Sequence, residues 1–193
     1  MIINVCISSK LSKTVLLALV FVSVAVPASS QTYKGQPVTV DLSLGQTATS
    51  GDDVILGTAA GERIKGNDGN DTLYGGRGDD LIYGARGFDE AYGGNDNDRL
   101  FGSHDDDVLY GDSGDDILKG HRGDDELRGG SGIDTLYGFQ GEDQLYGDSA
   151  DDRLYGGDDD DFLSGGNGTN DLCDGDAGND VDDPSCERKR DIP

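Results

Sequence analysis

Residues 75–84 read GGRGDDLIYG, in which three glycines and an arginine precede two aspartates, a short apolar run and a further glycine. The same order of glycine, acid and apolar residue returns in each successive nonapeptide. From Gly66 the chain reads GNDGNDTLY, GGRGDDLIY, GARGFDEAY, GGNDNDRLF, GSHDDDVLY, GDSGDDILK, GHRGDDELR, GGSGIDTLY, GFQGEDQLY, GDSADDRLY, GGDDDDFLS and GGNGTNDLC, ending at Cys173. Self-similarity at a fixed short period is typical of repeat architectures.

Three weaker units flank this array. ATSGDDVIL starts at Ala48 and GTAAGERIK at Gly57, directly before the regular units. GDAGNDVDD starts at Gly175, after one residue, Asp174, that we interpret as an insertion. The repeat region therefore begins at Ala48, and its regular part ends at Cys173.

Each position of the nonapeptide, here called a column, has its own chemistry. Column one is glycine in every unit except the first, and column six is acidic in nearly every unit. Column four is mostly glycine, with Asp96, Asp105 and Asp159 among the exceptions, and aspartate enters the left-handed backbone region more readily than most residues. Column eight is Ile or Leu from Ile55 to Leu172 except at Ala91, and column nine is often aromatic.

This pattern predicts an all-β fold. Glycine at this density argues against a helix, because each occurrence costs about 1 kcal/mol relative to alanine. One apolar column per nonapeptide fits a tight turn followed by a very short strand, with column eight inside and columns seven and nine outside. Two consecutive units would form one flattened coil with a strand on each side. We therefore expect a parallel β-roll, a two-sheet solenoid of nonapeptide repeats with two units per coil.

The acidic column predicts a cation. Backbone carbonyls of the turn and the column-six carboxylate are oxygen ligands, which a hard cation such as Ca²⁺ prefers, at six to eight per ion. One turn supplies too few of them. The turn two units later would lie about 4.8 Å away, so an ion between the two turns would complete its shell.

The sequence resembles the RTX, or hemolysin-type calcium-binding repeat, family, whose consensus is G-G-x-G-x-D-x-U-x with U a large apolar residue. The resemblance covers most of the chain. It implies a parallel β-roll that binds several Ca²⁺ ions between successive turns. Glu62 and Asn170 occupy the acidic column with non-consensus side chains, and the register of Asp180 is uncertain after the insertion. Carried over by column, the implied calcium ligands are Asp53, Asp71, Asp80, Asp89, Asp98, Asp107, Asp116, Asp125, Asp134, Asp143, Asp152 and Asp161.

No catalytic motif accompanies the repeats. HExxH and GxSxG are absent, and His104 and His121 sit in turn columns as exposed fillers. The extra acids of column five, such as Asp79 and Asp115, are interpreted as solvent-facing. A net charge of -24 argues against nucleic acid as a partner and suits a chain that collects cations. We therefore expect no enzyme.

The rest of the chain divides around the roll. Residues 1–30 resemble a secretory signal peptide: lysines precede an apolar run, Val15–Val26, that is short for a membrane span, and small residues follow it. A retained membrane anchor is the alternative. Residues 31–47 would cap the first coil, 48–173 form the roll and 174–193 a C-terminal cap. In an exported protein Cys173 and Cys186 predict a disulfide.

We therefore expect a secreted, extracellular calcium-binding protein whose folding calcium drives, without membrane insertion after the signal is removed. The alternative is a calcium-stabilised adhesin or matrix component that uses its aromatic columns. Column-nine rings two units apart would line each sheet, for polysaccharide binding, for self-association with a second roll, or for simple stacking along the ladder. Ice binding, known for some family members, is disfavoured because column three holds residues such as Arg77 and Arg122 instead of threonine.

Overall fold

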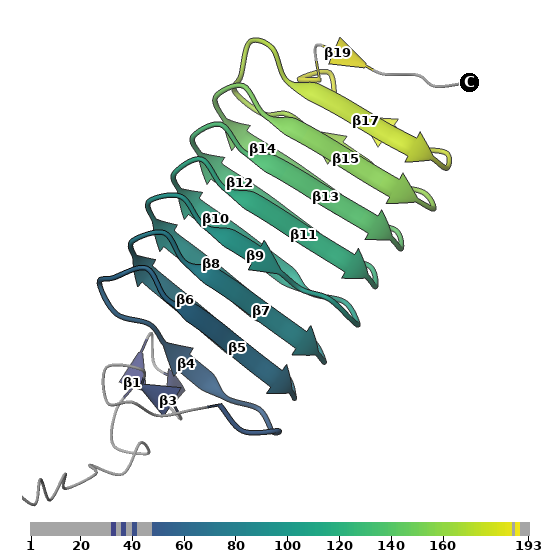
Figure 1. Cartoon of the computed structure of the whole chain (residues 1–193). Coiled ribbons are helices and arrows are strands. Elements are labelled where there is room, and N and C mark those ends of the chain that lie inside the picture. The colour runs from purple at the N-terminus through teal and green to yellow at the C-terminus, as the bar shows by residue number, and fades with distance from the viewer. Residues whose placement is uncertain (1–31, 34–35, 38–39, 42–47, 187, 190–193) are drawn as a thin grey trace, which may run out of the picture.

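The computed structural model describes residues 32–33, 36–37, 40–41, 48–186 and 188–189. In this part the chain winds into flattened coils stacked along one axis (Figure 1), with a strand on each side of every coil. The expected all-β fold, a two-sheet parallel solenoid, is confirmed.

The two parallel sheets take alternate strands of the chain, and a short antiparallel pair, β1 (Thr32–Tyr33) with β2 (Gln36–Pro37), precedes them. The first, here the even sheet, contains β3 (Val40–Asp41), β4 (Val54–Leu56), β6 (Thr72–Arg77), β8 (Glu90–Asn95), β10 (Val108–Ser113), β12 (Glu126–Ser131), β14 (Gln144–Ser149), β16 (Phe162–Ser164) and β18 (Val181–Asp182). The second, here the odd sheet, contains β5 (Arg63–Asp68), β7 (Leu81–Arg86), β9 (Arg99–Phe101), β11 (Ile117–Arg122), β13 (Thr135–Gln140), β15 (Arg153–Asp158), β17 (Leu172–Ala177) and β19 (Arg188–Lys189).

The register places identical columns side by side. Leu118 pairs with Leu136, and Leu136 with Leu154, so one coil takes two nonapeptide units. From β4 to β17 the core column points inward and its side chains are almost completely buried, whereas columns seven and nine are mostly half-buried or exposed. Because the sheets face each other across this single apolar column, the core is a row of Ile and Leu interrupted by Ala91.

The turns use left-handed backbone at two columns. Column four has positive φ, and the three aspartates predicted to tolerate it do so, with φ of 77° at Asp96, 71° at Asp105 and 79° at Asp159. At Gly114, in the same column, a Cβ atom would lie 1.9 Å from the carbonyl oxygen of Asp96 in the neighbouring coil. Column two also has positive φ, which the repeat pattern alone did not indicate.

The two ends of the roll are built differently. At the start, β3 adds to β4 in the even sheet. At the end, β19 pairs with β17, and a disulfide joins Cys173 to Cys186 as expected from the sequence. The expected signal peptide, residues 1–30, lies outside the described residues, as does most of the expected N-terminal cap. Among the described residues, none belongs to a helix long and apolar enough to cross a membrane.

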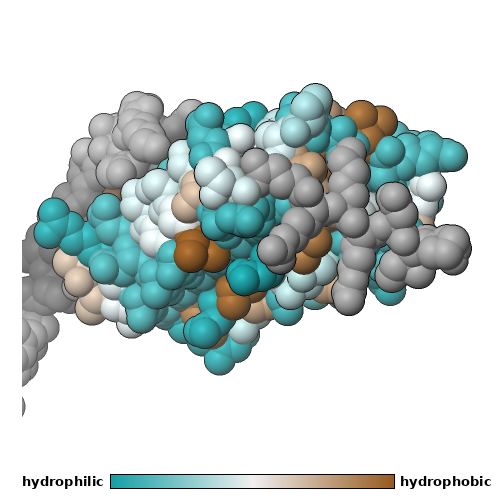
Figure 2. All heavy atoms as spheres, turned by 90° about the horizontal axis from the view of Figure 1, so that it is seen from above, coloured by the Kyte–Doolittle hydropathy of each residue, from teal (hydrophilic) through white to brown (hydrophobic). Residues whose placement is uncertain are grey.

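The outer faces carry stacked rings. Tyr74, Tyr92 and Tyr110 stack on the even sheet at centroid distances of 4.9 and 4.8 Å. On the odd sheet Tyr137 and Tyr155 stack at 4.9 Å. Seen from above, most of the surface is hydrophilic and its hydrophobic residues form small, separate patches (Figure 2). The ring faces are thus mostly turned to each other along the ladder.

Candidate metal centre

The column-six aspartates lie where each turn enters its strand, and they point inward. All twelve predicted ligands are buried, from 0 to 5 % exposed. From Asp71 to Asp161, one carboxylate oxygen, Oδ1, accepts a hydrogen bond from a backbone N–H of the preceding coil; for example, the N–H of Asp107 donates to Asp125 at 2.7 Å. These bonds join each turn to the next one along the axis.

The second oxygen of these carboxylates, Oδ2, is buried without a hydrogen-bond partner among the described residues in all predicted ligands except Asp53. A buried carboxylate oxygen without a partner is costly, and buried charges are usually paired or coordinate a metal. These unpartnered atoms belong to Asp71, Asp80, Asp89, Asp98, Asp107, Asp116, Asp125, Asp134, Asp143, Asp152 and Asp161, and also to Asp171.

The column-one glycine forms the wall beside Oδ2. A Cβ atom added to Gly111 would lie 2.4 Å from Oδ2 of Asp116 and 2.6 Å from the carbonyl oxygen of Gly129 in the next coil. The equivalent carboxylate and carbonyl oxygens lie 2.4 and 2.6 Å from the Cβ positions of Gly75 and Gly147. A carboxylate and a carbonyl oxygen from different coils therefore border one gap, which is the donor chemistry that calcium takes.

Burial shifts the acidity of these groups. It raises the pKa of Asp80 and Asp116 to about 6, of Asp125 to about 7 and of Asp107 to about 9. Each accepted N–H hydrogen bond offsets part of this rise, and the neighbouring aspartates add to it. A cation among these carboxylates would favour their ionised form, which the interior otherwise disfavours.

Asp53 and Glu62, in the first coil, are arranged differently. Oδ2 of Asp53 accepts hydrogen bonds from the N–H of Thr49 at 2.7 Å and from its hydroxyl at 2.9 Å. Thr58 likewise donates to Glu62, from its N–H to Oε2 and from its hydroxyl to Oε1. In this coil, threonine supplies the partner that the later carboxylates lack.

The register after Leu163 differs from the sequence-based one. Leu172 pairs with Arg153 and Cys173 with Leu154, so Cys173 occupies the core column and the extra residue lies in the preceding turn, not at Asp174. The column-six position therefore belongs to Asp171, not Asn170: Oδ1 of Asp171 accepts a hydrogen bond of 2.9 Å from the N–H of Asp152. Asp180 follows in the same column and accepts one of 3.1 Å from Asp161.

The column-five acids are mostly exposed, as expected, but they also join the turns. Oδ1 of Asp106 accepts a hydrogen bond of 2.9 Å from the N–H of Asp124, whose own Oδ1 accepts one of 2.9 Å from Glu142. This outer ladder runs in the opposite direction to the column-six ladder. The frequency of Asp and Asn in column five was the signal for it in the sequence.

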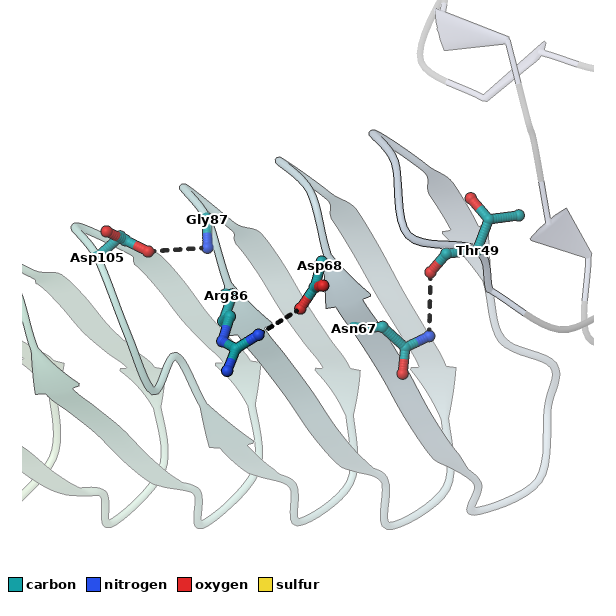
Figure 3. A network of polar contacts seen from close by, with 6 residues as sticks. All are labelled: Thr49, Asn67, Asp68, Arg86, Gly87 and Asp105. Carbon is teal, nitrogen blue, oxygen red and sulfur yellow. Dashed lines mark hydrogen bonds and ion pairs between the residues drawn. The ribbon is translucent and has the colours of Figure 1, made fainter.

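Further polar contacts join the first coils at their outer edge (Figure 3). The side-chain amide of Asn67 donates to the carbonyl oxygen of Thr49 at 3.2 Å, and Arg86 pairs with Asp68 at 3.4 Å. The N–H of Gly87 donates to Asp105 at 3.1 Å. All three contacts link neighbouring coils, so charged and polar side chains add to the coil-to-coil connection.

The two histidines do not contribute to a metal site of side chains. His104 is exposed, as expected, whereas His121 is half-buried. The described residues contain no group of three or more His, Cys, Asp or Glu side chains arranged to hold an ion. An ion between the turns would therefore require backbone carbonyl oxygens besides the carboxylates, as the sequence predicted.

Comparison with known families agrees with this geometry. A family model described as RTX calcium-binding nonapeptide repeat (4 copies) matches residues 47–82, 56–91, 92–127, 119–154, 137–172 and 146–182. These overlapping matches cover more than half of the chain and coincide with the stacked coils. No curated protein matches the chain.

Proposed function

Since the chain belongs to the RTX calcium-binding nonapeptide repeat family, we propose that it binds several Ca²⁺ ions between successive coils and that these ions drive its folding. The observation that carries the proposal is the row of buried Oδ2 atoms without partners among the described residues. A roll with so many desolvated carboxylates is unfavourable unless they are neutralised, and a bound divalent cation neutralises them while its ligands form.

The residues proposed to hold the ions are the column-six aspartates from Asp71 to Asp161, together with Asp171 and carbonyl oxygens of the adjoining turns. Asp53 keeps its column, but Thr49 already occupies its second oxygen, so we place it last among the predicted ligands. Calcium supplies charge neutralisation and cross-links between coils. The protein contributes the buried carboxylates and the glycine walls beside them.

We further propose that the protein acts outside the cytoplasm, with residues 1–30 as a secretory signal. Two observations support this: the short apolar run after lysines and the disulfide between Cys173 and Cys186. The calcium sites proposed above would also suit a calcium-rich exterior. Extracellular modules bind calcium at about 0.1–1 mM, a range in which one site at ten times its dissociation constant contributes about 1.4 kcal/mol. We assign the chain no catalytic role.

The second candidate, an adhesin or matrix component, depends on the outward rings. Their faces stack on one another, as in Tyr92 on Tyr110 at 4.8 Å, so few are free to stack on a sugar. Self-association of rolls is better supported than polysaccharide binding, because a groove on the odd sheet carries charges of both signs in a self-complementary order.

The test is a calcium titration of the purified protein, followed by far-UV circular dichroism and by calorimetry. We expect a largely disordered chain in chelator that becomes β-rich, cooperatively, in millimolar calcium. Magnesium is the control, because it prefers octahedral sites with retained water and should not replace calcium. A spectrum that is equally β-rich in chelator and calcium would contradict calcium-driven folding, and the absence of a binding heat would contradict the sites themselves.

A further inference from the structure

A groove of about 690 Å³ runs across the odd sheet, over the ends of β11, β13, β15 and β17. Its lining includes His121 and Arg122 from β11, Phe139 and Gln140 from β13, and Asp158 from β15. These are columns two and three of consecutive coils. The groove therefore spans several coils of the odd sheet, and a smaller hollow lies over the same columns of β6, β8 and β10 in the even sheet.

Bulky residues in this groove occupy left-handed backbone. His121 has φ of 87° and Phe139 of 88°, and their rings stack at 4.9 Å. On the even sheet the same column has Gly76, Gly94 and Gly130 among its left-handed residues, which adopt that backbone without a steric cost. A bulky residue there is an outlier, and strained residues cluster at binding sites.

Phe139 is also 39 % exposed, one of the few large apolar side chains that reach the surface. Its neighbour on the far side from His121 is Gly157, which has no side chain. The ring ladder thus stops at Phe139 and leaves a gap in the next coil. Burial, with Lys119 and His104 nearby, lowers the pKa of His121, so its ring enters the groove uncharged at neutral pH.

The charges of the groove are separated along the axis. Column three reads Arg122, Gln140, Asp158 in successive coils, so Gln140 stands between the two charges. Neither Arg122 nor Asp158 has an ion pair among the described residues, whereas Arg86, two coils before Arg122, pairs with Asp68 at 3.4 Å. One side of the groove is therefore cationic and the other acidic.

From this arrangement we propose that the groove is the interface of a two-fold symmetric dimer with a second copy of this chain. A two-fold axis along β13, between the facing odd sheets, keeps the position along each strand and reverses the order of the coils. Arg122 then lies opposite Asp158 of the second copy, and Asp158 opposite its Arg122. An isologous interface requires such a self-complementary patch.

The same rotation matches the other columns. The ring of His121 meets the gap at Gly157 of the second copy, and the hydroxyl of Ser103 meets the carboxylate of Asp176. Lys119, which already lies over the Tyr137 ring at 5.3 Å, meets Tyr155 of the second copy. Phe139 meets its own equivalent on the axis. The groove positions named here therefore find suitable partners in one orientation, whereas Ile117 in column seven faces Arg153 of the second copy.

This inference rests on the proposed calcium-bound roll, because calcium neutralises the acidic chain and makes close approach of two copies feasible. The test is sedimentation equilibrium of the full chain in millimolar calcium, over micromolar to millimolar protein. We expect the mass to rise toward twice that of the monomer. Arg122→Asp and Asp158→Arg should each weaken the dimer at least about tenfold, since each places like charges opposite one another.

The decisive sample is an equimolar mixture of these two variants. In the mixed dimer the carboxylate introduced by Arg122→Asp faces the guanidinium introduced by Asp158→Arg, and the native Asp158 of one chain faces the native Arg122 of the other. The doubled mass should therefore return. Arg77→Asp, the same charge change in column three of the even sheet, is the matched control and should leave the dimer intact. A mixture that stays monomeric, or a control that dissociates equally, overturns the proposal.

Phe139→Gly separates the interface from the fold. The substitution relieves the strained backbone at this position but also removes the stacking on His121, so we expect the roll to keep its β-rich spectrum, while the dimer should be lost. Circular dichroism of the same samples reports the roll: a monomeric wild type with the β-rich spectrum overturns the dimer alone. A spectrum that does not respond to calcium instead overturns the proposed function. Sedimentation equilibrium of the sample with the β-rich spectrum then tests the dimer separately. A Phe139→Gly protein that still dimerises contradicts this interface.

Discussion

The hydroxyl of Thr49 donates a hydrogen bond of 2.9 Å to Oδ2 of Asp53, the carboxylate oxygen that is left without a partner among the described residues in Asp71 and Asp80. In the first coil, a threonine side chain therefore bonds the carboxylate oxygen that has no partner among the described residues in later coils. Thr58 and Glu62 repeat the arrangement in the next unit. This coil adjoins β3, so hydrogen bonds and strand pairing hold the start of the roll.

We therefore predict that Asp53 and Asp125 respond differently to the same substitution. Asp125→Asn removes the charge of an open, buried carboxylate and should lower the calcium stoichiometry, with a loss of about 1.4 kcal/mol at ten times the dissociation constant of the site. Asp53→Asn should leave the stoichiometry unchanged. Calorimetric calcium titration of both variants checks this, and equal losses would show that Asp53 is a ligand like the others.

The raised pKa values of the carboxylates predict that folding without calcium and the affinity for calcium change with pH in opposite directions. The pKa of Asp125 is raised to about 7 and that of Asp107 to about 9, above the value of about 3.9 expected in an unfolded chain. A raised pKa means that the folded state binds protons more tightly. The stabilisation is complete below the unfolded pKa and is lost as the pH rises through the folded values.

Calcium-free protein should therefore gain β-structure when the pH falls from 8 to 5, a range that stays above its isoelectric point of about 4.1. The affinity for calcium should change in the other direction, because protons compete for the same oxygens. Circular dichroism in calcium-free buffer and calcium titrations at both pH values measure the two trends. Calcium-free protein that loses structure on acidification would be inconsistent with protonated interior carboxylates.

Glycine in column one is predicted to be required by the lack of space beside the carboxylate, not by a left-handed backbone. A Cβ atom on Gly120 would lie 2.0 Å from Oδ2 of Asp125, and the other oxygen of this carboxylate, Oδ1, is held by the N–H of Asp107. Gly120→Ala should therefore displace the carboxylate and cost about 1–3 kcal/mol, as overpacking does. Gly51→Ala is the control, because nothing lies within 4 Å of its Cβ position. Thermal unfolding in calcium compares the two, and equal midpoints would argue against this role of glycine.

The sequence predicted the coil, the buried column and the acidic column because each is a repeated chemical pattern. It did not place the extra residue near the C-terminus. The stretch from Gly165 to Gly175 allows the insertion either in the turn or after Cys173, and only packing decides: with the insertion in the turn, Cys173 rather than Leu172 enters the core beside Leu154. Asp171 was missed for that reason alone.

The roles of Thr49 and of the column-five aspartates were missed for a different reason. These side chains accept or donate hydrogen bonds whose geometry depends on the conformation of the turn. A polar column in the sequence does not specify which backbone or side-chain atom each residue will bond. The threonines recur only in the first two units, a signal that can be interpreted once Oδ2 of the later aspartates is seen to be open. The groove around Phe139 likewise depends on backbone angles that the repeat does not specify.

The disulfide between Cys173 and Cys186 is predicted to act locally. It closes a loop of 13 residues over the final coil, which in the chain-entropy model contributes about 3 kcal/mol. Cys186→Ala leaves Cys173 in the core column and removes the cross-link together with the buried Sγ of Cys186. Because a repeat array responds mainly through nearest neighbours, hydrogen exchange should accelerate in β17 and β18 and stay unchanged in β11.

Reduction of the wild-type protein should reproduce this pattern, which separates the loss of the bond from the change of side chain. The freed strand edge should also promote end-to-end association of rolls, seen as species larger than a dimer. A uniform acceleration in every strand would instead mean that the roll unfolds as one cooperative unit, with the disulfide stabilising the whole of it.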